Sequence, residues 1–523
     1  MARRFRPKSS RSYEVLKPQG QLSPRVQAVG PEHFGIVSVD CAKARSKFIL
    51  ADFYGHVLIA PTIVEHTQAQ LRAALGQVQA ALDQHELRDV VVAIERTGTY
   101  HRPMQVACRN AGLESRLVHP FASKQFRQPA DPNNKTDDTD LGGIHRAAVN
   151  GFGLLQPSWP DEYVVLQTLA RQRRDLVRKR SVLRCQIKET LHQLMPGYAE
   201  LFGAHFFDTS LAISLARGTG SAQALLELGL EGLRSRLDKF PYREATLLKV
   251  LAWARNAAPA GVALAPGSAP LLRESLARLA DDFARKSHEI QALEQRCAQA
   301  LVTTPDVLLL ALPGINVVSA AEFAGELGPI AHYAAANHIT GRAGLCPSRS
   351  QSDRVDNANG PLRRHGNRRL RAALLQIADN LIRHNHHYQA HSERWRRVGK
   401  DRRWIHVKVA HKFSRLAFVL LTTQRLFPHP ACQPRHSILE KLLAFHTEHK
   451  TDMALTMADL ERAAQQVPGR IRMEETRLLQ ALLDEPETRR RRGPVALTKL
   501  LPLVLARVGM RVLQSETEEQ DPG

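Results

Sequence analysis

The sequence contains few cysteines, and they are widely spaced. Six occur among 523 residues, and none forms a Cys-x-x-Cys pair. This pattern excludes a zinc ribbon and a disulfide-stabilised scaffold, and it fits a protein of a reducing cytoplasm.

Long apolar runs are also missing. No segment approaches the roughly 18 consecutive apolar residues of a membrane-spanning helix, so we expect no membrane association. The N-terminus is basic, but the apolar stretch of a secretory signal does not follow it. We interpret residues 1–32 as a flexible basic arm; a transit peptide is the alternative.

Acidic residues are scarce relative to basic ones. There are 51 Asp and Glu against 73 Lys and Arg, a net charge of +22, while 43% apolar and 24% charged residues are typical of a globular protein. At about 150 residues per domain, the length predicts two to four domains. The excess is clustered, with net +6 in residues 1–30 and net +14 in residues 342–425. Clustered positive charge predicts a polyanionic partner, most simply nucleic acid.

The second basic cluster also contains aromatic and histidine residues. Trp395 and Trp404 lie among arginines, a combination that suits phosphate contacts and base stacking. Seven histidines share the segment, but no acid or cysteine accompanies them at ligand spacing. We interpret them as surface or nucleic-acid contacts rather than metal ligands.

Residues 33–160 alternate between strand and helix patterns. Strands are predicted at 35–40, 47–53, 57–59, 89–95 and 117–119, with helices after the third, fourth and fifth strands. Three strands in a meander, then helix, strand, helix, strand and helix, is the order of the ribonuclease-H-like fold, a mixed sheet flanked by helices.

The rest of the chain is predicted to be helical, which makes the whole α/β plus all-α. In residues 161–304, apolar residues from Leu272 onward recur at alternating spacings of four and three, which predicts a long coiled-coil hairpin with an insertion at about 196–268. An intramolecular hairpin and a dimer interface are both compatible with this pattern. Residues 305–430 form a basic helical region, and residues 431–523 are a C-terminal extension whose acidic tail we expect to be disordered.

Four carboxylates stand out in the first region. Asp40 and Glu95 each end an apolar strand, and these strands are neighbours in the predicted order. Asp137 and Asp140 lie three apart on a helix and share one face. A cluster of oxygen ligands selects Mg²⁺ or Mn²⁺, and two such ions support phosphodiester chemistry. The alternative is that these are ordinary loop acids and helix-start acids, with Thr136 as an N-cap.

These residues resemble a known family, the DEDD insertion-sequence transposases, which include the Piv-type DNA invertases and have a RuvC-like N-terminal domain. The resemblance is carried by residues 37–40, 93–98 and 134–140, and then in order by residues 312–315, 343–347, 351–352 and 365–371. Three residues depart from the family pattern: Leu141 replaces Ala, Asn316 replaces Gly, and Asp353 replaces the Gly after the family's serine.

The resemblance implies a catalytic centre made by two domains. Asp40, Glu95, Asp137 and Asp140 would hold two Mg²⁺ or Mn²⁺ ions, and Ser352, from a helical C-terminal transposase domain, would attack DNA to form a phosphoserine intermediate. Nucleic-acid contacts are expected from basic residues near both motifs: Lys135, Arg349, Arg354, Arg363, Arg364, Arg368, Arg369 and Arg371.

The resemblance also implies partners and a location. Donor and target DNA would be bound by a homo-oligomer, a dimer that forms a tetramer in the synaptic complex. A non-coding bridge RNA would pair with both DNAs and so select their sequences. The protein would be a cytoplasmic, nucleoid-associated prokaryotic enzyme. Two other functions stay open: a RuvC-like nuclease that hydrolyses branched DNA with the same acids, and a non-catalytic nucleic-acid-binding protein.

Overall fold

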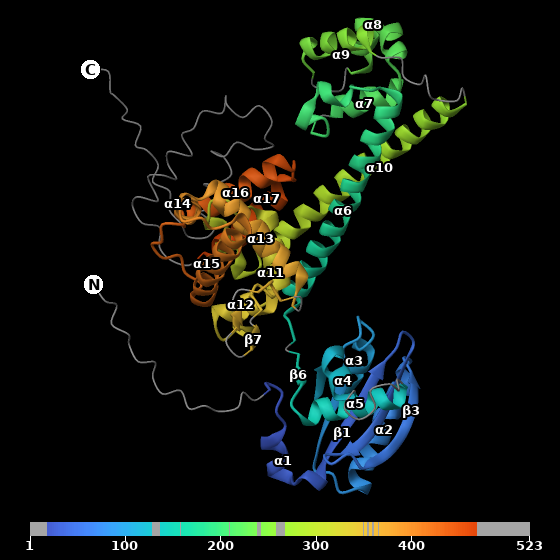
Figure 1. Ribbon diagram of the computed structural model, residues 1–523, viewed down its shortest axis with the longest axis vertical. Helices are drawn as coiled ribbons and strands as arrows, with labels where there is room; N and C mark the ends of the chain where they lie inside the picture. The colour runs from blue at the N-terminus through green and yellow to red at the C-terminus, as the bar shows by residue number, and fades with distance from the viewer. Residues whose placement is uncertain are drawn as a thin grey trace, which may run out of the picture. The chain divides into compact units, whose positions relative to one another are not determined.

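The computed structural model describes residues 18–127, 136–156, 158–208, 210–237, 242–257, 267–348, 350–352, 355–357, 360–363 and 366–467. The chain divides into two compact units, Met1–Ser158 and Trp159–Gly523. Figure 1 shows the strands of the large sheet in the first unit and mostly helices in the second. No helix in the described part of the chain is long and apolar enough to cross a membrane.

The first unit is built on a six-stranded mixed sheet of order β3-β2-β1-β4-β5-β6. The strands are β1 (Phe34–Cys41), β2 (Arg45–Asp52), β3 (Val57–Glu65), β4 (Asp89–Glu95), β5 (Ser115–Val118) and β6 (Gly153–Leu155). β1, β4 and β5 are parallel, whereas β2, β3 and β6 pair antiparallel with their neighbours. This arrangement confirms the expected ribonuclease-H-like sheet and adds β6.

Helices cover both faces of this sheet. One face packs against α2 (Gln68–Gln84) and α3 (Arg102–Asn110), with a core that includes Val37 and Val39. The other packs against α5 (Asp137–Val149), with a core that includes Ile36 and Ala93. Because successive side chains of a strand point to opposite faces, this split fixes the face on which each residue of β1 and β4 lies.

Two helices of this unit were not expected. α1 (Ser23–Val29) lies within the segment interpreted as a flexible arm, but its Val26 is buried in the core under α5. Its Arg25 donates to both Asp89 (2.5 Å, Nη2 to Oδ1) and Glu114 (2.6 Å, Nη1 to Oε1). This segment is therefore part of the folded unit; residues 1–17 lie outside the described residues. The second unexpected helix is α4 (Pro120–Arg127).

Two 34-residue helices, α6 (Asp161–Leu194) and α10 (Ser268–Leu301), form an antiparallel pair in the second unit. The start of α6 shares a core with the end of α10, and the end of α6 shares a second core with the start of α10. On α10 every seventh residue of the predicted seam is buried: Leu276, Phe283, Ile290 and Cys297. The other predicted positions, Leu272, Leu279, Lys286, Leu293 and Ala300, are half-buried.

The insertion between these arms is a small helical cap. It contains α7 (Ser210–Thr219), α8 (Ala222–Arg236) and α9 (Glu244–Asn256). Tyr198, Phe206 and Leu247 are among its buried residues, and they pack with Leu191 and Leu276 of the arms. The cap therefore buries the far ends of α6 and α10.

The remaining helices of the second unit share one apolar core. They are α11 (Val317–Leu327), α12 (Ala336–Ala343), α13 (Arg368–His384), α14 (His386–Arg397), α15 (Arg402–Thr423), α16 (His436–Glu448) and α17 (Met453–Gln466). α16 and α17 belong to the segment that we expected to be an extension, yet they join this core through Leu442 and Leu460. Lys441 of α16 donates to the carbonyls of Leu310 (2.6 Å) and Leu312 (2.7 Å).

The turn after the 3₁₀ helix Pro305–Ala311 needs a glycine. Gly314 has φ +91°, and a Cβ there would lie 2.8 Å from the carbonyl oxygen of Asn380 in α13. Asn316 then caps α11, since its side chain accepts from the Ser319 backbone N–H (2.8 Å). This cap gives a physical reason for asparagine at this position.

We expect Gly314→Ala to lower the free energy of unfolding by about 2–4 kcal/mol, because both the positive φ and the close backbone oppose a Cβ. Urea denaturation of the full chain measures the effect. Gly341→Ala is the matched control, since a Cβ at this position in α12 meets nothing within 4 Å. Equal stability of the two variants would contradict the packing argument.

Candidate active site

The sheet brings Asp40 and Glu95 together at the ends of two neighbouring strands. In the parallel register of β1 and β4, Val39 pairs with Ile94 immediately before the two acids. Val39 and Ile94 both lie in the core under α2 and α3. By alternation, Asp40 and Glu95 therefore project to the opposite face, the one that α5 covers.

The first turn of α5 carries the other two acids. Thr136 caps the helix, accepting from the backbone N–H of Thr139 (3.2 Å), whose side chain in turn accepts from Thr136 N–H (2.9 Å). Asp140 is half-buried and lies on the same stripe as Ile144, which faces the sheet, whereas Asp137 is exposed. The helix N-terminus favours acids at these positions electrostatically.

Helix α4 supplies direct partners to two of the acids. Ser123 Oγ donates to Glu95 Oε1, and Arg127 Nη1 forms an ion pair with Asp140 Oδ1. Thr97 Oγ1 donates to the second carboxylate oxygen of Glu95 (3.0 Å). Gly143 permits this close approach of α4 and α5, because a Cβ there would lie 2.8 Å from the Ser123 carbonyl oxygen.

Besides Arg127, a second cationic side chain near the acids is Lys47 of β2. Lys47 is the cross-strand partner of Asp40, and its Nζ lies 2.7 Å from Oδ1 of Asp138. Asp138 is thus paired with a lysine of the neighbouring sheet. Lys47 and Arg127 together offset part of the negative charge of this face.

The pKa of the buried Cys41 thiol is affected by the same acids. Burial, with smaller contributions from the negative charges of Asp40 and Glu95, raises the pKa of Cys41 to about 11. The thiol is therefore neutral at physiological pH, and it lies on the α2 and α3 face, opposite the acids.

Over the described residues, no group of three or more His, Cys, Asp or Glu side chains is gathered closely enough to hold a metal ion. One of the four acids, Asp140, is instead paired with the guanidinium of Arg127. The carboxylates themselves offer only oxygen donors, which fit Mg²⁺ or Mn²⁺.

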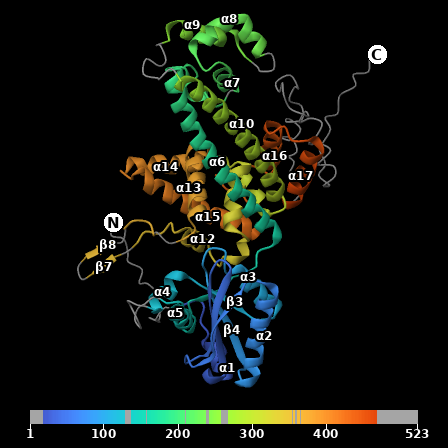
Figure 2. The same ribbon diagram turned by 90° about the vertical axis from the view of Figure 1, so that its right-hand side faces the viewer.

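In the second unit, Ser352 ends a strand of a β-hairpin that we did not predict. β7 (Ser350–Ser352) pairs antiparallel with β8 (Val355–Asn357), and Ser352 pairs with Val355 beside the turn. Figure 2 shows this hairpin extending away from the helices of its unit. Ser352 thus belongs to the tip of a ribbon, and Asp353 lies outside the described residues.

Ser348 lies at the base of the hairpin, where hydrogen bonds hold its backbone. Ser348 N–H donates to the Pro361 carbonyl (2.9 Å), and Gly360 N–H donates to the Ser348 carbonyl (3.0 Å). A Cβ at Gly360 would overlap Ser348 Oγ, so the two residues pack closely. Ser348 therefore has a structural position at the root of the ribbon.

The predicted nucleic-acid contacts have different environments. Arg363 and Arg368 are exposed, whereas Arg369 is half-buried. Arg371 donates to the carbonyls of Ala343 (2.8 Å) and Arg363 (2.6 Å), which fixes the segment before α13. The other predicted contacts lie outside the described residues: Lys135, Arg349, Arg354 and Arg364.

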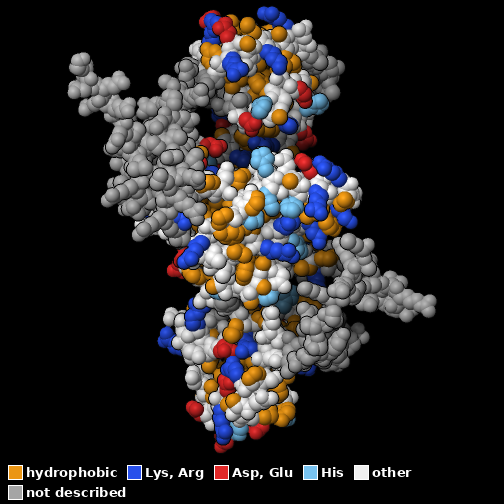
Figure 3. Space-filling view, turned by 90° about the vertical axis from the view of Figure 1, so that its left-hand side faces the viewer, with side chains coloured by type: hydrophobic (Ala, Val, Ile, Leu, Met, Phe, Trp, Pro, Cys, Tyr) orange, Lys and Arg blue, Asp and Glu red, His pale blue; other side chains and the backbone are white. Residues whose placement is uncertain are grey.

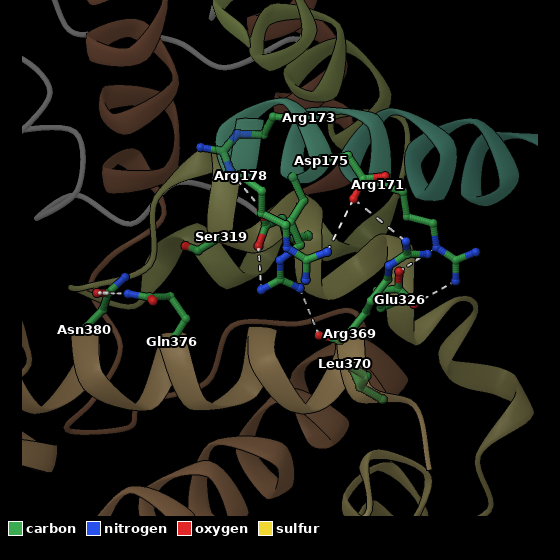
Figure 4. Close-up of polar contacts among 12 residues, drawn as sticks. Arg171, Arg173, Asp175, Arg178, Ser319, Glu326, Arg369, Leu370, Gln376 and Asn380 are labelled. Atoms are coloured by element: carbon green, nitrogen blue, oxygen red, sulfur yellow. Dashed lines mark hydrogen bonds and ion pairs between the residues drawn. The ribbon is translucent and has the colours of Figure 1, made fainter. Parts of the chain in front are cut away.

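Arginines of α6 are committed to acids of other helices. Arg171 makes a two-pronged contact with Glu326 of α11 (2.7 and 2.9 Å), whose side chain is only 4% exposed. Arg173 pairs with both Glu322 (2.8 Å) and Glu294 (2.6 Å). Figure 4 shows Arg171 and Glu326 in contact, with Arg369 approaching from α13. These arginines join α6 to its neighbours.

Sequence reasoning missed three side chains at the acidic site: Lys47, Ser123 and Arg127. Their contacts depend on tertiary packing, and α4 is a short amphipathic helix. Pro120 at its first position is a helix-start signal that could have revealed α4.

Comparison with known protein families gives two matches along the chain. A family model of DEDD transposases, described as a transposase of the IS110 type, matches residues 37–196, and one described as the transposase IS116/IS110/IS902 family matches residues 306–393. A search of curated proteins gives no match. With both domains present in this order, the chain belongs to the DEDD family of insertion-sequence transposases, which recombine the DNA of mobile elements.

Proposed function

We propose that this transposase cleaves and rejoins DNA through a covalent bond to Ser352, with the acids of the first unit holding divalent metal ions. The observation that carries this proposal is the convergence of Asp40 and Glu95 on the face that receives Asp140. Enzymes of this family are generally dependent on divalent metals.

In the proposed reaction, Ser352 Oγ attacks the scissile phosphorus. A bond from serine oxygen to phosphorus forms as the phosphorus–oxygen bond to the leaving strand breaks, and the serine proton passes through solvent to the departing hydroxyl. Attack by a hydroxyl of another strand reverses these steps. Two ester bonds are exchanged without loss of the phosphodiester, so no ATP is needed.

The residues around the acids have separate tasks in this proposal. Asp40, Glu95, Asp137 and Asp140 would hold two ions, Mg²⁺ or Mn²⁺, which when bound polarise the phosphate and stabilise charge on it. Ser123 and Thr97 orient the Glu95 carboxylate through their hydroxyls. Arg127 and Lys47 limit repulsion between the acids in the absence of metal.

The proposal extends to the partners. Donor and target DNA would bind the exposed arginines of the second unit, such as Arg363 and Arg368, with Lys135, Arg349, Arg354, Arg364 and Arg369 as further contacts. Sequence reading would be delegated to a bridge RNA, and two dimers would assemble into a tetramer on two duplexes. Support comes from the family and from the clustered positive charge of residues 342–425.

Ser352→Ala is expected to abolish the covalent protein–DNA adduct formed on a suicide substrate, because no other atom would take the phosphoryl group. Denaturing electrophoresis measures the adduct. Ser348→Ala is the matched control, and it should retain the adduct at a level that reflects only its stability. Undiminished cleavage by Ser352→Ala would favour a hydrolytic nuclease instead.

Asp40→Asn and Glu95→Gln are each expected to reduce strand cleavage by at least about 100-fold, because each removes a charged metal ligand. Asp138→Asn, at the exposed acid beside Lys47, should reduce it by less than about threefold. Cleavage assays with Mg²⁺ and with excess EDTA test both statements. Full activity of the two variants would support a non-catalytic nucleic-acid-binding role.

Arg127→Met is expected to raise the affinity for Mn²⁺ by about threefold to tenfold, since it removes a positive charge that competes for Asp140. In metal-free buffer the same change should lower stability by about 1–2 kcal/mol, because the pair is largely buried. Electron paramagnetic resonance measures free Mn²⁺. Lys47→Met, which removes the cation paired with Asp138 rather than Asp140, is the comparison and should raise the affinity less. An unchanged or weaker Mn²⁺ affinity in Arg127→Met would show that the guanidinium does not compete.

A further inference from the structure

A row of aromatic rings crosses the second unit on α14 and the loop after α15. The His391 ring stacks on Trp395 (centroids 5.5 Å apart), His387 lies 4.7 Å from His391, and His429 lies 5.1 Å from His387. The row ends at Phe427, 6.0 Å from His429. His387, His391 and Trp395 are four apart, so they occupy one stripe of α14.

One end of this row opens into a small pocket of about 280 Å³. Rings of His387, His429 and Phe427 line it, its floor includes the buried Tyr388 and Leu416, and Lys412 and Arg415 of α15 contribute the charge. Among the described residues that line it there is no Asp or Glu. Figure 3 shows histidine side chains gathered beside Lys and Arg side chains on one face of the molecule.

The histidines do not make this a metal site. No group of three or more metal-binding side chains occurs in the described part of the chain, here or elsewhere. Partial burial, with the positive charge of Lys412 adding to it, lowers the pKa of His387, His391 and His429. The rings are therefore neutral at physiological pH and present π faces rather than positive charges.

We infer that this pocket binds one unpaired nucleotide of a single-stranded nucleic acid, with the base against the rings of His387 and His429 and its phosphate on Lys412 and Arg415. Aromatic faces beside cations are the combination that binds unpaired bases without reading their sequence. The pocket is smaller than the usual range for drug-sized ligands, roughly 300–1,000 Å³, and suits a single base. A paired base in a duplex is already stacked and does not enter such a pocket.

This inference rests on the proposed function, in which the transposase binds DNA and a bridge RNA, and it deepens that function. The unpaired nucleotide could come from a guide RNA or from a melted DNA strand, and the chemistry of the pocket is the same for both. Separate RNA and DNA probes distinguish these two sources.

The test uses the full chain in EDTA, so that metal-dependent cleavage plays no part in the readout. Short single-stranded RNA and DNA of one sequence, each with a central 2-aminopurine, are titrated with protein, and a duplex of equal length is titrated in parallel. Stacking on the histidine rings should quench the fluorophore. Tighter binding of the RNA would identify a guide strand as the source, and tighter binding of the DNA would identify a melted strand.

His387→Ala should weaken single-strand binding by about tenfold and remove the quenching, whereas His387→Phe, which keeps a ring, should stay within about twofold of the original chain. Lys412→Ala should weaken binding but leave the remaining complex quenched. Arg255→Ala, at an exposed arginine of α9, is the charge control and should change binding by less than about twofold.

Unchanged binding in both His387→Ala and Lys412→Ala would overturn the inference, as would an equal loss of duplex and single-strand binding. Because no cleavage is measured, these outcomes are independent of whether Ser352 forms the covalent adduct. Thermal unfolding of each variant separates loss of the pocket from loss of the fold, and the ring-keeping variant provides the decisive comparison if His387→Ala is unstable.

Discussion

The parallel pairing of β1 with β4 is the constraint on which the acidic site depends. A shift of one residue in this register would turn one of the two acids to the opposite face of the sheet. The buried neighbours prevent such a shift, because Val39 and Ile94 belong to the core under α2 and α3 while Ile36 and Ala93 belong to the core under α5. Two apolar cores on opposite faces therefore position a polar pair that lies in neither.

Internal ion pairs reduce the share of the net positive charge that is available to bind a polyanion. Several arginines are neutralised inside the second unit, as with Arg171 on Glu326 and Arg173 on Glu294 and Glu322. Arg371 is hydrogen-bonded to backbone carbonyls. A count of charges thus overstates what is available to a polyanion, and the residues with solvent-exposed charge, such as Arg363, Arg368 and Arg415, are the better candidates.

The sequence predicted those parts of the fold that have strong periodic patterns. The apolar strands of the sheet and the seven-residue spacing of Leu276, Phe283, Ile290 and Cys297 have this property. α4 and the β7–β8 hairpin are short and contain many polar residues, and β6 is only three residues long, so local patterns do not separate them from loops. α1 was missed because it lies beside a strongly basic stretch, although Leu22 and Val26 are buried.

The candidate site was predictable to a similar degree. Convergence of Asp40 and Glu95 follows from strand order alone, which the sequence pattern specifies. The contacts that Lys47, Ser123 and Arg127 make with the acids depend on how β2 and α4 pack, and no spacing rule in the sequence encodes them. The proposed assignment of Ser352 rests on family resemblance, because a serine in a basic segment has no distinguishing local pattern.

The two halves of the proposed catalytic centre differ in how firmly they are held. The acids lie on a six-stranded sheet with helices on both faces, whereas Ser352 belongs to a two-stranded ribbon, an element of marginal stability by itself. The ribbon is fixed at its root, where Pro347 pairs with Leu362 and Ser348 packs against Gly360. A proposed nucleophile near the tip of such a ribbon would be held less firmly than the carboxylates on the sheet. Such a difference suits strand exchange, because a covalently held DNA end must move between partners whereas the groups that stabilise charge must be preorganised.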